Sequence, residues 1–167
     1  MKCFGGLVAG CVWSLLATSA YADNWKPHNV RDHLRGSVGV GTAAVGEIEE
    51  RSGTHEAELI VNCAENSTTV VVTSRFVFFG TNKLTVEYTI NGGAVQRAVW
   101  STCAETNCAG LWAGAGIPFL KSLQEKALLR MTFTRYTGTK IHADFDITGA
   151  KEAFVPVGRA CGWIAKP

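Results

Sequence analysis

The amino-acid sequence predicts a mostly β fold, either an antiparallel β-sandwich or a partly open barrel, with one or two short helices. Runs rich in β-branched and aromatic residues follow one another from residue 57 onward, and short turn sequences separate them. The sequence lacks the regular alternation of strands and helices that builds a parallel sheet. Four cysteines beyond residue 22 add the expectation that the fold is disulfide-bonded.

Residues 1–22 have the pattern of a signal peptide. Lys2 supplies a positive charge, an apolar run follows, and Ala20-Tyr21-Ala22 offers small residues at the positions that signal peptidase reads. Cleavage there would leave residues 23–167 as a periplasmic or secreted bacterial protein. The residues before Cys11 also match a lipoprotein box, which would attach a lipid to Cys11. We favour simple cleavage, because the apolar run continues well beyond Cys11.

Composition places the exported chain among single globular domains. The sequence has 167 residues, of which 47% are hydrophobic and 18% charged. Loss of Lys2 lowers the formal net charge from +2 to +1, whereas a nucleic-acid-binding surface needs a much more basic balance. No later stretch reaches about 18 consecutive apolar residues, the length of a membrane-spanning helix. We therefore expect a signal peptide, an N-terminal arm and first strand region over 23–56, and a β-rich domain over 57–167.

The expected strands lie mainly in the β-rich domain. Residues 23–36 are polar and are interpreted as an arm or short helix, and residues 36–46 fit either a strand or a loop. Asn91-Gly92 between two alternating runs is a strong hairpin signal, because both residues tolerate a positive φ. The expected strands are residues 57–63, 68–79, 84–90, 94–100, 128–136 and 141–147.

Two segments are expected to be helical. Residues 118–127 start with a proline and place Phe119, Leu120 and Leu123 on one face. Residues 149–161 form a shorter candidate, in which Pro156 predicts a kink or two broken turns.

The four remaining cysteines allow three disulfide pairings. Cys103 and Cys108 enclose only four residues, so we expect them to pair locally and to leave Cys63 with Cys161. The alternative is a four-thiolate zinc site, which the sequence disfavours because it lacks the C-x-x-C pairs that normally build one.

Three titratable residues lie at alternate positions of one expected strand. His142, Asp144 and Asp146 would share one face of the strand over 141–147, where they could hold a metal or act in a metal-dependent hydrolase. The same pattern fits the solvent face of an amphipathic strand, and we favour that interpretation. No nucleophilic-serine or zinc-protease motif is present. The sequence therefore predicts no catalytic residue, no metal ligand and no cofactor.

Trp112 is the candidate residue for binding a protein partner. It follows Leu111 in an apolar, glycine-rich loop next to the Cys103–Cys108 pair. A large aromatic side chain on a loop held by a disulfide is suited to partner contact. Tryptophans are more often core residues, and that alternative applies to Trp25, Trp100 and Trp163 as well.

Several motifs follow one another in an order that resembles one protein family. They are Leu59-Ile60-Val61 with Cys63, Asn66 and Thr68; Val86, Tyr88 and Ile90; Trp100-Ser101; Phe119 and Leu123; Phe145-Asp146-Ile147 with Gly149; and Ala160-Cys161-Gly162-Trp163. In this order they resemble the VasI/TagO family, exported bacterial proteins associated with type VI secretion. The likeness covers residues 57–163, and the order of the motifs and the closing Cys-Gly-Trp carry it.

The resemblance implies a cell-envelope accessory protein that acts by binding a secretion-apparatus or other envelope protein, without an assigned catalytic activity. It also implies the Cys63–Cys161 disulfide, because the shared motifs contain both cysteines. The chain departs from the family at Thr102 and Ala150, where the family tends to have Asp and Leu. The extra Cys103–Cys108 pair resembles the invasion-associated IalB-like family. That second resemblance implies a virulence-associated exported protein, and an inhibitor of a host or rival enzyme is a further alternative.

Overall fold

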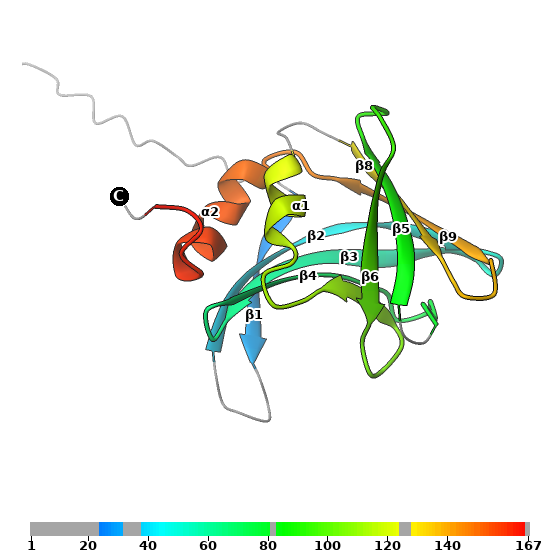
Figure 1. The fold of residues 1–167 in the computed structure, drawn as a ribbon, viewed down its shortest axis with the longest axis horizontal. Helices are drawn as coiled ribbons and strands as arrows, with labels where there is room; N and C mark the ends of the chain where they lie inside the picture. Colours follow the sequence, from blue (N-terminus) through cyan, green and yellow to red (C-terminus); the bar gives the residue numbers. More distant parts are fainter. Residues whose placement is uncertain (1–23, 32–37, 81–82, 124–127, 166–167) are drawn as a thin grey trace, which may run out of the picture.

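The computed structural model describes residues 24–31, 38–80, 83–123 and 128–165, and shows an antiparallel β-barrel with two short helices (Figure 1). The signal-peptide assignment and Cys11 lie outside the described residues. The strands are β1 (Trp25–Arg31), β2 (Val38–Glu50), β3 (Gly53–Ala64), β4 (Ser67–Thr73), β5 (Lys83–Ile90), β6 (Gln96–Thr102), β7 (Cys108–Leu111), β8 (Leu128–Thr134) and β9 (Lys140–Asp146). The helices are α1 (Ile117–Ser122) and α2 (Ala150–Ala160).

The sheet closes on itself through β2 and β9. The strand order is β1-β2-β3-β4-β7-β6-β5-β8-β9, and β9 pairs back onto β2 from Gly46↔Phe145 to Glu49↔His142. Closure makes an eight-stranded barrel of β2 to β9, so of the two predicted architectures the barrel is the one observed. The first half of β2 pairs with β1 instead, from Trp25↔Ala44 to Arg31↔Val38. Strand β1 is thus an addition to the edge of the barrel.

Side chains fill the inside of the barrel. The alternation of apolar and polar residues predicts this for strands that have one face toward the core and one toward solvent. Every second residue of β5, β8 and β9 is buried. Trp100 is fully buried and meets Phe133 edge-on at a centroid distance of 5.8 Å, and Phe79 meets the same ring at 5.1 Å. The tryptophans Trp25 and Trp100 are therefore core residues.

Helix α2 packs on the barrel away from the turns that join β2 to β3 and β8 to β9 (Figure 1). The Phe154 ring meets the Trp25 ring edge-on at 5.0 Å, and Gly149 begins the helix with a φ of 77° that suits glycine. A disulfide joins Cys161 to Cys63 of β3, with the Cα atoms 5.7 Å apart. The helix runs through Pro156 as one element, rather than as two broken turns. No helix in the described ranges is long and apolar enough to cross a membrane.

The structure corrects three expectations about elements. Residues 25–31 are a strand and not an arm or short helix, because they pair along their whole length with β2. The long strand expected over 68–79 ends at Thr73. Residues 108–111, expected within a loop, form β7 between β4 and β6. The expected domain boundary at residue 57 falls inside β3, and one sheet continues across it.

Candidate functional site

Three aromatic side chains are exposed at the end of the barrel that carries the β2–β3 and β8–β9 turns. Phe76 is 70% exposed, Phe78 50% and Tyr136 78%. The phenylalanines lie in the segment 74–80 between β4 and β5, and the tyrosine lies in the β8–β9 turn. We call these three residues the aromatic end.

The segment 74–80 bends at residues 75 and 76, and burial alternates along residues 76–79. Val77 and Phe79 are buried in the core, whereas Phe76 and Phe78 face solvent. Two backbone hydrogen bonds tie the segment to the β6–β7 hairpin, from Ser74 N to Asn107 O at 3.2 Å and from Phe79 N to Thr106 O at 2.9 Å. The exposed rings therefore stand on a segment that is anchored at both ends.

Arg135 connects three chain segments at this end. Its Nη2 donates to Glu50 Oε2 at 2.9 Å and to the carbonyl oxygen of Phe78, and its guanidinium carbon lies 5.8 Å from the centre of the Phe78 ring. The Arg135 and Glu50 side chains are each only 15% exposed. A partly buried ion pair loses less of its strength to solvent than a surface pair does. The Arg135–Glu50 pair thus holds Phe78 against the β2–β3 and β8–β9 turns.

A second set of contacts supports Phe76. Ser52 Oγ donates to Glu50 Oε1 at 2.8 Å and lies 3.2 Å from His55 Nε2. The His55 ring lies 5.4 Å from the Phe76 ring, with the planes tilted by 32°. The hydrogen bond from Ser52, followed by the Arg135 contact, lowers the pKa of Glu50 against the opposing effect of its burial. Because the serine donates to the glutamate, the three side chains lack the serine–histidine–carboxylate relay of a hydrolase.

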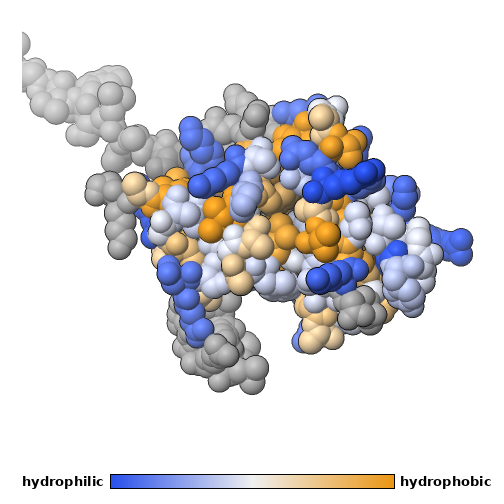
Figure 2. Space-filling view, in the orientation of Figure 1, coloured by the Kyte–Doolittle hydropathy of each residue, from blue (hydrophilic) through white to orange (hydrophobic). Residues whose placement is uncertain are grey.

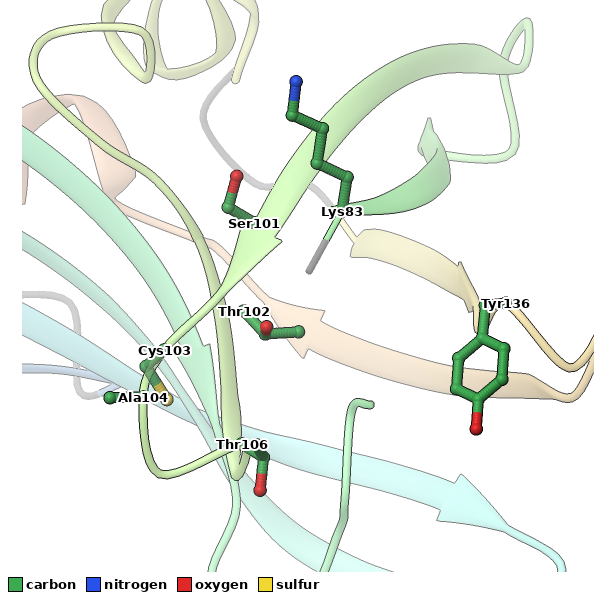
Figure 3. A pocket seen from close by; sticks show the side chains of 7 residues that line it. All are labelled: Lys83, Ser101, Thr102, Cys103, Ala104, Thr106 and Tyr136. Atoms are coloured by element: carbon green, nitrogen blue, oxygen red, sulfur yellow. The ribbon is translucent and has the colours of Figure 1, made fainter. Parts of the chain in front are cut away.

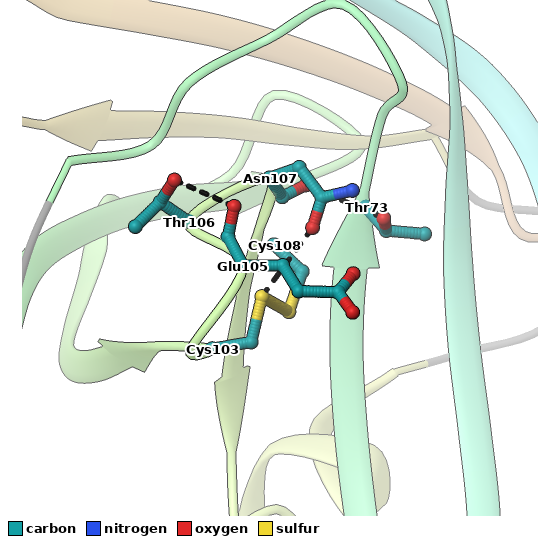
Figure 4. Close-up of a disulfide and its surroundings, with 6 residues drawn as sticks. All are labelled: Thr73, Cys103, Glu105, Thr106, Asn107 and Cys108. Atoms are coloured by element: carbon teal, nitrogen blue, oxygen red, sulfur yellow. Dashed lines mark hydrogen bonds between the residues drawn. A yellow bond between two sulfur atoms is a disulfide. The ribbon is translucent and has the colours of Figure 1, made fainter.

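A pocket of about 1010 Å³ opens beside the aromatic end (Figure 3). Its lining includes Lys83 at the start of β5, Ser101 and Thr102 at the end of β6, Thr106 in the β6–β7 hairpin, and Tyr136. Cys103 also lines the pocket, and a disulfide joins it to Cys108, with the Cα atoms 5.5 Å apart (Figure 4). Both disulfides, Cys63–Cys161 and Cys103–Cys108, are the pairs that the sequence predicts.

The titratable face on β9 forms a different, smaller pocket of about 350 Å³ on the barrel wall. His142 and Asp144 line it together with Glu47, Glu49, Thr54 and Arg130. Asp144 accepts two hydrogen bonds at 3.0 Å, one from Nε and one from Nη2 of Arg130, and these contacts raise the pKa of Arg130. The His142 Nδ1 atom lies 3.1 Å from Thr132 Oγ1.

Asp146 does not line this pocket. Its carboxylate accepts a hydrogen bond from Thr148 N at 2.9 Å, and the contacts with Thr148 lower its pKa. Ala143 and Phe145 point inward, as the alternation predicts. In the described ranges no group of three or more histidine, cysteine, aspartate or glutamate side chains could hold a metal ion. His55 and Arg135 do not line this pocket, and they instead contact Phe76 and Phe78 of the aromatic end.

Trp112 lies at the other end of β4 from the aromatic end. The backbone of its loop is tied to the start of β4 by a hydrogen bond from Gly114 N to Thr68 O at 2.8 Å. Trp112 is 37% exposed, so part of its ring is accessible. Leu111 is only 9% exposed and packs in the core, so it offers no accessible surface to a partner.

Sequence reasoning missed Phe76 and Phe78 because it placed them in a continuous strand. The signal that could have found them is the run of four apolar residues over 76–79. A strand of a barrel with a wet outer face alternates apolar and polar residues, whereas this run is apolar at every position. Two of its four side chains therefore have to face solvent.

Comparison with protein-family models, with curated proteins and with solved structures gives no match for this chain.

Proposed function

We propose that this protein is an exported, non-enzymatic binding protein of the bacterial cell envelope, and that it contacts a protein partner through the aromatic end. The observation that carries the proposal is the exposure of Phe76, Phe78 and Tyr136 on segments that buried contacts hold in place. Clustered exposed aromatic side chains are typical of interaction surfaces, and aromatic residues dominate the binding energy of many interfaces.

The geometry of the rings favours binding over a purely structural role. Figure 2 also shows hydrophobic side chains near the middle of the face that it draws, among hydrophilic ones. At the aromatic end, by contrast, two phenylalanine rings are exposed to solvent on a segment that is fixed in place. Arg135, whose side chain is largely buried, and two backbone hydrogen bonds hold this segment. Ordered side chains lose little conformational entropy on binding, which favours affinity.

The Trp112 loop and the free edge of β1 are further candidate contacts. Closure of the barrel leaves β1 as the strand with a free edge in the described sheet, but Pro27 within it cannot donate a backbone hydrogen bond to an added strand. Trp112 keeps its proposed role as a second contact, without Leu111.

The compartment and the class of partner follow from the disulfides and the resemblance. Two disulfides are typical of proteins that fold in the periplasm or outside the cell. The resemblance to the VasI/TagO family favours an envelope or secretion-apparatus protein as partner, with a link to type VI secretion. The IalB-like resemblance favours a virulence-associated role, with inhibition of a host or rival enzyme as a further alternative. A hydrolase centred on His142 is disfavoured because Asp146 lies outside the His142 pocket.

Affinity capture with matched variants tests this proposal. The bait is the disulfide-bonded protein, presented to envelope extract, with the double variant Phe76→Ser/Phe78→Ser beside it. The control is Val95→Ser/Val99→Ser, which removes two apolar side chains that are 62% and 60% exposed. We expect a partner that the wild type and the control retain and the phenylalanine variant loses. Equal retention by all three proteins would contradict the proposed surface.

Trp112→Ala tests the second contact. Because Trp112 is more than a third exposed, we expect its loss to cost no more than about 1 kcal/mol of the free energy of unfolding. We also expect weaker capture of the same partner, measured in the same experiment. Unfolding of the variant would show that Trp112 is a core residue and would remove it from the binding surface.

A further inference from the structure

The pocket beside the aromatic end has a lining with a distinctive chemistry. Among the described residues, Lys83 is the only charged one that lines it, and Ser101, Thr102 and Thr106 carry hydroxyl groups, of which that of Thr106 donates to the Glu105 carbonyl oxygen at 2.6 Å. Figure 3 shows the Tyr136 ring across the pocket from Thr102 and Thr106, whereas the Lys83 side chain lies beside Ser101 and extends away from those three residues. The lining therefore combines one cation, several hydroxyls and one exposed aromatic ring.

The positive charge of this pocket is not cancelled nearby. Lys83 has no carboxylate partner in the described part of the chain. The nearest acidic residue of the hairpin, Glu105, lines a separate pocket together with Thr73 and Asn107. Figure 4 shows its carboxylate on the Thr73 side of the disulfide. The hairpin thus separates Glu105 from the pocket that Lys83 lines.

Each part of the lining selects a different feature of a ligand. A lysine ammonium binds an anionic group, and a hydroxyl can both donate and accept a hydrogen bond, which suits a ligand with many hydroxyl groups. A tyrosine ring offers a flat apolar face to the C–H groups of a sugar ring. The volume lies at the upper end of the range of small-molecule sites, so it has room for more than one sugar unit.

We infer that this pocket binds a carboxylated saccharide, such as a chain of uronic acid units. Lys83 pairs with a carboxylate, the Ser101 hydroxyl binds a sugar hydroxyl, and Tyr136 stacks on a sugar ring. This site shares Tyr136 with the aromatic end, but Phe76 and Phe78 do not line it.

Isothermal titration calorimetry with trigalacturonic acid as probe tests the inference, with neutral maltotriose as the comparison. We expect the disulfide-bonded protein to bind the acidic trimer at least about tenfold more tightly than the neutral one, because a charge-assisted contact is worth roughly that factor. Lys83→Met removes the charge with little change in side-chain length, and we expect it to abolish the preference. Tyr136→Ala should weaken binding of both probes.

Lys140→Met is the matched control, since Lys140 is also exposed beside the β8–β9 turn but does not line the pocket. It should bind the acidic trimer like the wild type. The inference is overturned by absence of binding at millimolar trimer, by equal affinity for the two probes, or by an unchanged preference in Lys83→Met. The variant Phe76→Ser/Phe78→Ser should keep full saccharide affinity, so failure of one proposal is distinguishable from failure of the other.

Discussion

At the residue scale, the aromatic end depends on Arg135. This side chain contacts Glu50 and the Phe78 carbonyl oxygen while being only 15% exposed. Its removal would leave a half-buried carboxylate without its cation and the Phe78 carbonyl without its donor. The position of the Phe78 ring thus depends on one partly buried charge, which no pattern of hydrophobicity reveals.

Arg135→Met is therefore expected to lower the free energy of unfolding by about 2 kcal/mol. Arg130→Met is the matched control, because Arg130 also pairs with a carboxylate but its side chain is 62% exposed. An exposed pair contributes at most about 1 kcal/mol. Urea denaturation of both variants measures the difference, and equal losses would contradict a special role for Arg135.

Glu50 gives the stability of this end a dependence on pH, through the hydrogen bond from Ser52 first and then through the contact with Arg135. Its pKa is lowered in the folded protein, so the folded state binds its proton less readily than the unfolded state does. The stabilisation is therefore complete above the ordinary pKa of about 4.5 and is lost as the pH falls through the lower folded value. We expect Glu50→Gln to be less stable than the wild type at pH 7 and to lose this deficit progressively as the pH falls below 4.5. A deficit that persists unchanged at pH 3 in urea denaturation would contradict this role.

At the scale of the elements, the pairing of β2 with β9 closes the barrel. Gly46 sits opposite Phe145 in this pair. A Cβ atom at position 46 would collide with the Asp144 carbonyl oxygen and with the Phe145 ring. The glycine thus allows the two strands to approach while a large core side chain packs next to them.

Gly46→Ala is expected to cost about 2–3 kcal/mol of the free energy of unfolding, the range of overpacked cores. Val45→Ala serves as the control on the same strand, because Val45 is 43% exposed and its truncation removes little buried surface. Thermal unfolding followed by circular dichroism compares the two. A Gly46→Ala variant as stable as the Val45→Ala variant would show that the pairing of β2 with β9 tolerates a side chain at position 46.

The sequence predicted the elements whose local pattern agrees with the barrel. The hairpin at Asn91-Gly92 and the alternation over 141–147 are local signals, and both match the structure. Strand β1 was missed because its pairing with β2, and not its polar composition, makes it a strand. Strand β7 is only four residues long and lies in a glycine-rich run, so its pairing with β4 is invisible in the sequence alone.

At the scale of the whole molecule, the two disulfides constrain loops of very different length. Cys63 and Cys161 are separated by 98 positions and join β3 to the end of α2, whereas Cys103 and Cys108 are separated by five within one hairpin. In the chain-entropy account, a disulfide stabilises more when it closes a longer loop.

Replacing both cysteines of the long disulfide by serine is therefore expected to cost about 4–5 kcal/mol, against about 2 kcal/mol for the short one. Urea denaturation of the oxidised variants measures both losses. The Cys103→Ser/Cys108→Ser variant should stay folded and cooperative. A larger loss from the short disulfide than from the long one would contradict this ranking.

The candidate site was predictable only in part, because it is assembled from segments far apart in the sequence. Trp112 could be proposed from its loop alone, and the structure leaves part of its ring accessible. Phe76 and Tyr136 come to one end only through the order of strands in the closed barrel. The Glu50–Arg135 contact spans 85 positions, and no local pattern indicates it.

Site-specific photo-crosslinking in cells of the source organism tests the central claim most directly. A photoreactive phenylalanine analogue replaces Phe76 in one variant and the similarly exposed Val95 in another. We predict one discrete crosslinked protein from position 76 and none from position 95. A crosslink from position 95 but not from position 76, or none from either position, would contradict the claim that the aromatic end is the surface that binds a protein partner.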